Sequence, residues 1–101
     1  MSLSPTTLYK YVAETRNYVM DFTSILLNGI IITNINSVTY VVSSGAPDIS
    51  LNVSAGSIIA NGTKIGIAVT GGLAGNTYNI TILVTTSDAQ ILEGIGQLVV
   101  Q

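Results

Sequence analysis

Five carboxylates are the side chains in this sequence that are best suited to acid-base chemistry: Glu14, Asp21, Asp48, Asp88 and Glu93. The 101 residues include neither cysteine nor histidine. This removes thiolate nucleophiles, the usual general base near neutral pH and the commonest zinc ligands. A pair of carboxylates at the right separation could still hydrolyse a glycosidic bond, so a glycosidase is the enzyme class left to weigh.

The local contexts of these carboxylates argue for turns rather than catalysis. Asp48 follows Pro47, and Asp88 follows Ser87 in a polar segment between two apolar runs. Aspartate in such positions usually accepts hydrogen bonds from the neighbouring backbone. We therefore predict that the protein is not an enzyme and has no catalytic, cofactor-binding or metal-binding residues.

Two other kinds of short motif have structural explanations. Asn-x-Ser/Thr triplets begin at Asn52, Asn61 and Asn79, and a chain with 30 Ser, Thr and Asn residues produces such triplets by chance. The glycines at 71–72 and 94–96 lack the strand, helix and lysine arrangement of a phosphate-binding loop. We interpret them as turn positions and as a β-bulge at Gly94 or Gly96.

Charge is scarce, which limits the classes of partner. Charged residues make up 8% of the chain and the net charge is −2, whereas about 25% is typical. There is no basic stripe for a phosphate backbone, so we expect no nucleic acid partner. The longest apolar stretch, residues 25–35, is interrupted by polar residues, so we expect no membrane span. The first residues lack the basic start of a secretory signal.

The elements that position these residues are predicted to be strands. The chain contains 14 Ile, 10 Val and 12 Thr, and β-branched residues favour sheets over helices. Apolar residues alternate in four segments, at residues 16–24, 38–42, 64–70 and 77–86. This period of two places Ile65, Ile67 and Val69 on one inward face. A second such set is Ile49, Leu51 and Val53.

Residues 73–100 are the clearest guide to the fold. They consist of a glycine turn, a long Thr-rich strand, a polar turn and a return strand, with Tyr78 where the tyrosine corner of a β-sandwich occurs. Asn28-Gly29 indicates either a hairpin or a bend between strands, and Asn61-Gly62 indicates a second turn. We predict an all-β, immunoglobulin-like or fibronectin III-like antiparallel β-sandwich; a small jelly roll or partly open barrel is the alternative.

The amino-terminal residues differ in composition from the rest, because scattered apolar and aromatic side chains lie among Ser and Thr. We predict an N-terminal arm over residues 1–14 and a sandwich domain over residues 15–101. The arm could lie extended on a neighbouring subunit, pack back on its own sandwich, or form a helical turn after Ser4-Pro5. Its predicted partner-binding residues are Leu3, Leu8, Tyr9, Tyr11 and Val12.

A set of spaced residues resembles a known family. The order is Tyr18-x-x-Asp21-Phe22-x-x-x-Leu26, an aromatic-centred strand at Tyr40, a strand closing in Gly71-Gly72, and Gly75-Asn76-Thr77-Tyr78 before an alternating Thr-rich run. This resembles small tailed-bacteriophage virion proteins with an immunoglobulin-like sandwich, which include fibre-tail adaptors and head-decoration proteins. Relatives usually carry Trp at two positions where this chain has Phe22 and Tyr40.

The resemblance implies a non-enzymatic virion structural protein. The main expectation is a capsid decoration or cement protein that clamps neighbouring subunits of the major capsid protein, and the alternative is a fibre-tail adaptor or tail component. Expected partners are the major capsid protein or other virion proteins and copies of itself, as a trimer or ring, in a virion assembled in the host cytoplasm. From the residues alone, a carbohydrate- or cell-surface-binding module using Tyr9 and Tyr11 is a further alternative.

Overall fold

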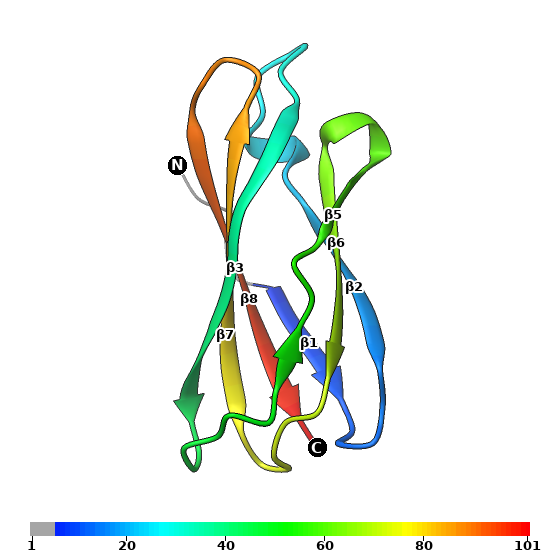
Figure 1. The fold of residues 1–101 in the computed structure, drawn as a ribbon, viewed down its shortest axis with the longest axis vertical. Helices are drawn as coiled ribbons and strands as arrows, with labels where there is room; N and C mark the ends of the chain where they lie inside the picture. The colour runs from blue at the N-terminus through cyan, green and yellow to red at the C-terminus, as the bar shows by residue number, and fades with distance from the viewer. Residues whose placement is uncertain (1–5) are drawn as a thin grey trace.

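Two β-sheets packed face to face form the protein (Figure 1), and the computed structural model describes residues 6–101. The elements are β1 (Thr6–Lys10), β2 (Arg16–Asp21), the 3-10 turn η1 (Thr23–Ile25), β3 (Ile32–Ser44), β4 (Asn52–Val53), β5 (Ser57–Ile59), the 3-10 turn η2 (Ala60–Gly62), β6 (Lys64–Thr70), β7 (Thr77–Thr86) and β8 (Ile91–Val100). The prediction of an all-β sandwich is confirmed, and its immunoglobulin-like subtype stays a prediction. No helix among residues 6–101 has the length and apolarity to span a membrane.

The strands divide between the two sheets in a fixed order. Sheet A has the order β1-β8-β7-β3, and sheet B has the order β2-β6-β4 with β5 also paired to β6. Strands β4 and β5 pair with successive parts of β6, so together they make one interrupted edge strand. Strand β1 runs parallel to β8, and the other pairs are antiparallel. Strands β3, β7 and β8 of sheet A lie toward the left of Figure 1, and β2, β5 and β6 of sheet B lie on the right.

Alternating apolar residues from both sheets form the core, as the period-two pattern predicts. Inward-facing residues of β6 and β7 are buried, among them Ile65, Ile67, Val69, Tyr78, Ile80, Ile82 and Val84. Phe22, just after β2, is also fully buried between the sheets. Burying side chains of this size stabilises the fold by about 1.5–3 kcal/mol each.

The two Asn-Gly turns have different roles. The sequence leaves open whether Asn28-Gly29 forms a hairpin or a bend between strands. It is a bend, because it lies between β2 of sheet B and β3 of sheet A. There the Ile30 amide donates to the Leu27 carbonyl at 2.9 Å. Asn61-Gly62 instead joins β5 to β6, which are antiparallel neighbours.

The predicted bulge at Gly94 or Gly96 is wrong. The register of β7 and β8 is continuous from the pair Thr77 and Val99 to the pair Thr85 and Ile91. Gly94 faces inward, and a Cβ there would lie 2.1 Å from Met20 Sδ. This glycine therefore makes room for sheet B. The register shifts occur in β3, the long edge strand of sheet A, where such irregularities hinder pairing with another chain.

The predicted inward set Ile49, Leu51 and Val53 holds only in part. Leu51 is buried and Val53 packs against the core, whereas Ile49 is 96% exposed. Strand β4 begins at Asn52, so Ile49 belongs to the loop before it and is outside the strand periodicity. Local turn geometry around Pro47 and Asp48 overrides the pattern.

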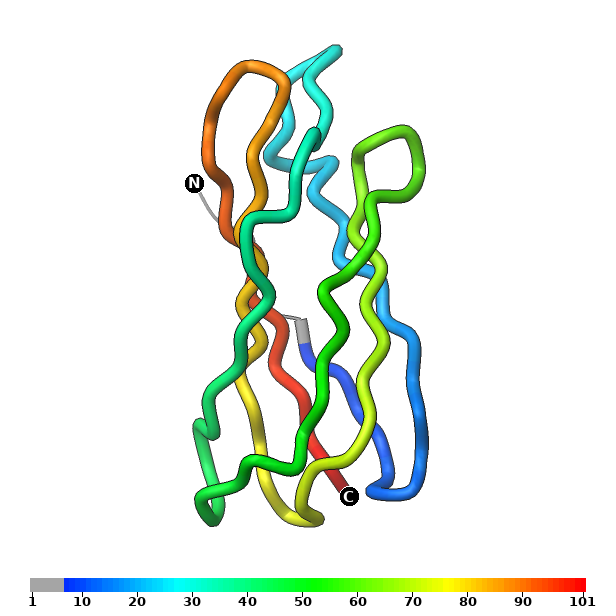
Figure 2. Tube along the Cα trace, in the orientation of Figure 1, coloured from blue at the N-terminus to red at the C-terminus, as the bar shows by residue number. Residues whose placement is uncertain are grey.

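The described part of the arm belongs to the sandwich. Residues 6–10 form β1 at the edge of sheet A and not a helical turn. The trace in Figure 2 follows the chain from β1 through a turn into β2 of the other sheet. Leu3, one of the predicted partner-binding residues, lies outside the described residues.

Candidate functional site

The three aspartates bond residues within their own turns or loops rather than forming a shared site, and Glu93 lies apart on β8. Asp48 Oδ1 accepts hydrogen bonds from the Ser50 amide at 2.9 Å and the Ser50 hydroxyl at 2.7 Å. Asp88 accepts a hydrogen bond from the Thr86 hydroxyl. The predicted hydrogen bond to local backbone is thus confirmed at Asp48, whereas Asp88 in the β7–β8 turn bonds a side-chain hydroxyl instead. Within residues 6–101, no three acidic, histidine or cysteine side chains gather in a way that could hold a metal ion.

Tyr78 forms the predicted corner at one end of the sandwich. Its hydroxyl accepts a hydrogen bond from the Leu73 amide at 3.0 Å and donates one to Asp48 Oδ2 at 2.5 Å. The hydrogen bonds from Tyr78 and Ser50 hold the pKa of Asp48 below its ordinary value. Burial and the Asp48 carboxylate raise the pKa of Tyr78. The pair is therefore structural, because a neutral phenol and an ionised acid stabilise each other.

The loops around Tyr78 interlock, and we call this region, loops 45–50 and 71–76, the Tyr78 end. The Asn76 side chain donates to the Ala46 carbonyl at 2.7 Å and accepts from the Ala46 amide at 3.0 Å. Gly71 has a φ of +75°, and a Cβ there would lie 2.2 Å from the Ser50 carbonyl oxygen. The two loops thus approach as closely as glycine permits.

A buried lysine fixes the described part of the arm, and sequence reasoning missed it. Lys10 is 1% exposed. Its ammonium donates to the carbonyls of Tyr11 at 2.8 Å, Val12 at 3.1 Å and Gly71 at 2.7 Å. Burial lowers the pKa of this amine. The signal in the sequence was the alternation Leu8-x-Lys10, which puts both side chains on the inward face of a strand.

The predicted arm residues fall into two groups. Leu8 is half-buried against the core, whereas Tyr9 and Tyr11 are 54% and 61% exposed and Val12 is exposed beside them. The Tyr18 hydroxyl donates to the Tyr9 carbonyl at 2.6 Å and so ties β1 to β2. We call Tyr9, Tyr11 and Val12 the N-terminal patch. Its role in binding a partner stays a prediction.

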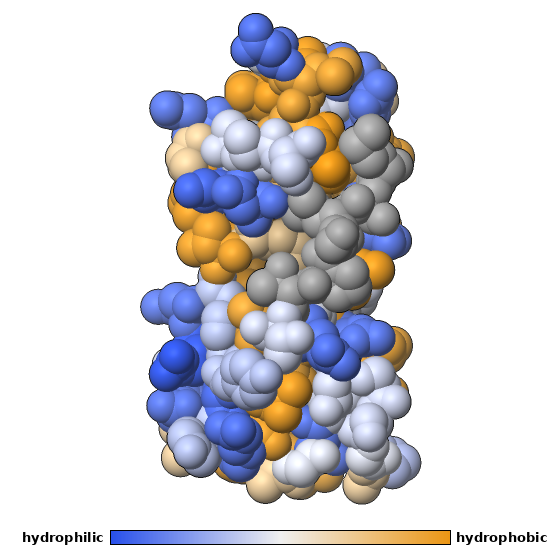
Figure 3. Space-filling model, turned by 180° about the vertical axis from the view of Figure 1, so that it is seen from behind, coloured by the Kyte–Doolittle hydropathy of each residue, from blue (hydrophilic) through white to orange (hydrophobic). Residues whose placement is uncertain are grey.

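A second apolar surface lies at the opposite end of the molecule, where loops 22–31, 60–63 and 87–90 meet; we call this the Leu27 end. Leu27 and Ile91 are 66% and 63% exposed, and Ile31 is also exposed. Figure 3 shows apolar side chains gathered toward this upper end, with a more polar surface below. Sequence reasoning missed these three residues, which we call the Leu27 patch. The short apolar runs on either side of Asn28-Gly29, at residues 25–27 and 30–32, were the available signal.

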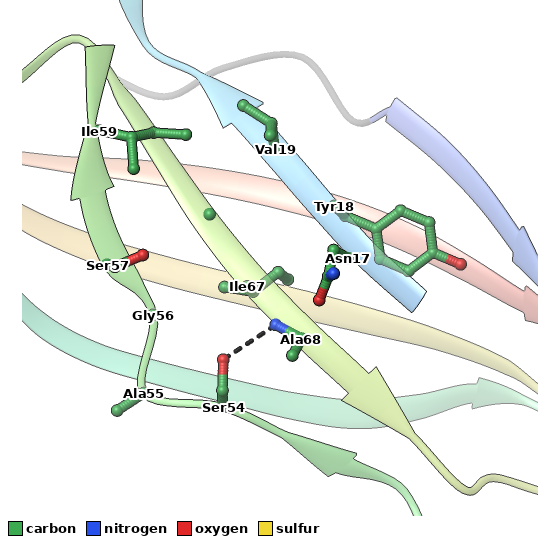
Figure 4. Close-up of a pocket in the computed structure, with 11 residues that line it drawn as sticks. Asn17, Tyr18, Val19, Ser54, Ala55, Gly56, Ser57, Ile59, Ile67 and Ala68 are labelled. Carbon is green, nitrogen blue, oxygen red and sulfur yellow. Dashed lines mark hydrogen bonds between the residues drawn. The ribbon is translucent and has the colours of Figure 1, made fainter. Parts of the chain in front are cut away.

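A groove crosses the outer face of sheet B. It has a volume of about 470 Å³ and lies over β6, with β2 on one side and the β4–β5 edge on the other (Figure 4). Gly66 and Ala68 form its floor, and Val19 and Ile59 are among the residues that line it. At the break between β4 and β5, the Ser54 hydroxyl accepts from the Ala68 amide at 2.9 Å.

Comparison with known protein families identifies the family to which the chain belongs. A family model described as podophage GP4 fiber-tail adaptor protein gp77 matches residues 10–96. The chain belongs to this family. A search of curated proteins finds no match. The matched region begins at the last residue of β1 and ends within β8, so it includes nearly the whole sandwich.

Family membership confirms the expectation of a small tailed-phage virion protein. The family is one of tail-associated structural proteins, so it favours the tail alternative over capsid decoration, for which the match gives no support. The sequence resemblance therefore pointed to the right family. It placed capsid decoration ahead of the tail role, whereas the family match gives more support to the tail role.

Proposed function

We propose that this protein is a non-enzymatic fibre-tail adaptor that joins other proteins of the phage tail within the virion. The observation that carries this proposal is the family match over residues 10–96. The scattered turn-bound carboxylates are in keeping with a role in assembly rather than catalysis. Assembly in the host cytoplasm, before release of the particle, belongs to the same proposal.

The positions of the exposed apolar residues support a joining role. An adaptor needs two contact surfaces that do not overlap. The molecule is 41 Å long and about half as wide, and the N-terminal patch and the Leu27 patch lie toward opposite ends of it (Figure 1). Each patch can cover apolar area on a different neighbour without competition from the other.

The scarcity of charge fits contacts inside a particle. Only eight of the 101 side chains are charged at neutral pH, so a neighbour that covers this surface desolvates few ions. Modest contacts of this kind become strong when many copies act on one particle. The same surface is poorly protected against association when the protein is free in solution.

Position and copy number in purified particles test the proposal. Quantitative mass spectrometry against the major capsid protein should give about a dozen copies or fewer, the number expected of a ring at one vertex. Gold-labelled antibody should mark the tail. Hundreds of copies spread over the head would overturn the adaptor role and restore capsid decoration.

Separate variants of the two patches sharpen this test. Leu27→Ser and Tyr11→Ser should each reduce incorporation into particles and should stop assembly at different stages, because each removes a contact with a different neighbour. Ile49→Ser is the matched control, since Ile49 is 96% exposed and belongs to neither patch. Equal incorporation of all three variants would rule out both patches as contact surfaces.

A further inference from the structure

The groove on sheet B exists because its central strand lacks outward side chains. In β6, Ile65, Ile67 and Val69 face the core, so the residues between them face outward. The register aligns Gly66 with Val19 of β2 and with Ser57 of β5. A row with side chains on both flanks and none in the middle makes a hollow, and Gly66 and Ala68 line it. Figure 4 shows Ala68 between Asn17 of β2 and Ser54 beside the β4–β5 edge.

Nothing within the described chain requires glycine at position 66. Its φ lies outside the left-handed region, and a Cβ there would meet only Ser57 Oγ at 3.6 Å and Ile59 Cδ1 at 3.7 Å, which are ordinary contacts. Gly94 is the opposite case, because its Cβ would overlap Met20. Glycine in a strand interior weakens the strand and often marks a close approach by another backbone or ligand. Gly66 therefore leaves room above the middle of β6 that a side chain could occupy without a clash.

The outer face of sheet A has the complementary form. Strands β7 and β8 direct Thr81, Leu83, Glu93 and Ile95 outward, in two rows that the register sets side by side. These side chains are partly exposed. The outer face of sheet A, opposite the groove, thus carries the apolar side chains of Leu83 and Ile95 beside Thr81 and Glu93.

The charges of the two faces are also complementary. Lys64 is the outward residue of β6 next to the groove, and Glu93 is the acidic residue on the outer face of sheet A. The ion pair found among residues 6–101 joins Arg16 and Glu14, so neither Lys64 nor Glu93 has an ionic partner there. Asp21 lies opposite Lys64 in the register and feels its charge, but the Asp21 carboxylate accepts two hydrogen bonds from Thr23 and forms no ion pair with Lys64.

We propose that the groove over Gly66 and Ala68 binds the outer face of sheet A of a second copy of this chain, with Lys64 facing Glu93 of that copy. Such a contact joins two different surfaces, so it is heterologous. Each added copy leaves one groove and one sheet A face free. Copies therefore continue to add until the array closes into a ring or extends as a filament. This inference concerns self-association and does not depend on where the protein lies in the particle.

Filling the groove is the first test. In Gly66→Val, the added side chain occupies the groove and suits a strand, so the melting temperature should equal or exceed that of the wild type. Sedimentation velocity should show concentration-dependent assembly of the wild type and at least a ~10-fold weaker association for this variant. Ala68→Val fills the same groove and serves if Gly66→Val does not fold. Ala13→Val, on the β1–β2 turn, is the control and should assemble normally.

Mixing variants is the decisive test. Ile95→Lys disrupts the sheet A face but leaves the groove intact, and Ala13→Lys is its control. Gly66→Val and Ile95→Lys should each be monomeric alone and should form a dimer, and nothing larger, when mixed in equal amounts. The proposal is overturned by a wild type that stays monomeric, by filled-groove variants that assemble normally, or by a mixture that remains monomeric, as it would with a two-fold symmetric interface.

Discussion

The Tyr78 end and the Leu27 end of the sandwich use their loops in opposite ways. At the Tyr78 end, loops 45–50 and 71–76 are joined by side-chain hydrogen bonds from Asn76 and Tyr78, and glycines allow backbone to meet backbone. At the Leu27 end, hydrogen bonds link Ile31 and Ser87 at 2.8 and 3.2 Å, while Leu27 and Ile91 stay exposed. The loops of the Tyr78 end are tied to each other by several hydrogen bonds, although Ile49 on one of them is exposed, whereas the Leu27 end combines fewer loop contacts with three exposed apolar side chains, Leu27, Ile31 and Ile91.

This difference separates the residues that stabilise the fold from those that are free to contact a partner. Substitutions of the hydrogen-bonded residues and close-packed glycines at the Tyr78 end should lower the free energy of unfolding, because they break interactions within the chain. Substitutions at the Leu27 end should change that free energy little and should instead affect binding. The N-terminal patch is held at the first end, where Lys10 binds the Gly71 carbonyl at 2.7 Å, so its position depends on the interlocked loops.

The largest expected effect comes from a matched pair of glycine substitutions. Gly71 and Gly29 have similar positive φ angles, +75° and +81°, but only at Gly71 would a Cβ meet other atoms, with the Ser50 oxygen at 2.2 Å. Gly71→Ala should lower the free energy of unfolding by more than about 3 kcal/mol, and Gly29→Ala by about 1 kcal/mol from backbone strain alone. Urea denaturation measures both, and equal losses would contradict the comparison.

Removal of the Tyr78 hydroxyl should have the next largest effect. Tyr78→Phe takes away the partner of the Leu73 amide and the donor to Asp48. Leaving these groups unsatisfied should lower the free energy of unfolding by about 1–3 kcal/mol. Thermal denaturation measures this loss. Tyr11→Phe is the control and should leave the melting temperature unchanged, because Tyr11 is exposed.

Acid should loosen the Tyr78 end through Asp48. Its folded-state pKa lies below the ordinary value of 3.8, so the unfolded chain takes up the proton first as the pH falls. This contribution to stability is complete above 3.8 and is lost as the pH drops toward the folded-state pKa. Asp48→Asn should therefore reduce the dependence of unfolding free energy on pH in this range. Asp21, whose pKa is also lowered, should retain its own contribution, so an unchanged pH dependence would contradict the assignment.

The smallest effect on stability is expected at the Leu27 end. Leu27→Ser should change the free energy of unfolding by less than about 0.5 kcal/mol, because the side chain is already 66% exposed. Chemical denaturation measures this difference. A loss as large as that of Tyr78→Phe would mean that Leu27 supports the fold and would remove the contrast between the two ends.

Sequence reasoning predicted the elements that follow a regular alternation. The inward faces of β6 and β7 and the Tyr78 corner are as expected, because a period of two and a local turn are properties of short segments. Gly94 was misread, since its Met20 contact joins residues far apart in the chain. A lone glycine in a strand pattern fits a bulge equally well.

The candidate surfaces were harder to predict for the same reason. Exposure of Tyr9 and Tyr11 follows from local pattern, whereas the burial of Lys10 depends on the Gly71 carbonyl, 61 positions away. The groove over Gly66 requires knowledge that β2 and β5 both pair with β6. Strand order of this kind is set by the packing of the whole chain and leaves little trace in any single segment.

The place of β8 between β1 and β7 has a consequence for biosynthesis. A ribosome produces the chain from the amino terminus, so β1 cannot pair with β8 until residues 91–100 have left the exit tunnel. During that time the backbone of β1 and one edge of β7 lack the strand with which they form hydrogen bonds. Sheet A therefore closes only after translation of its central strand, and the nascent chain depends on folding faster than it aggregates.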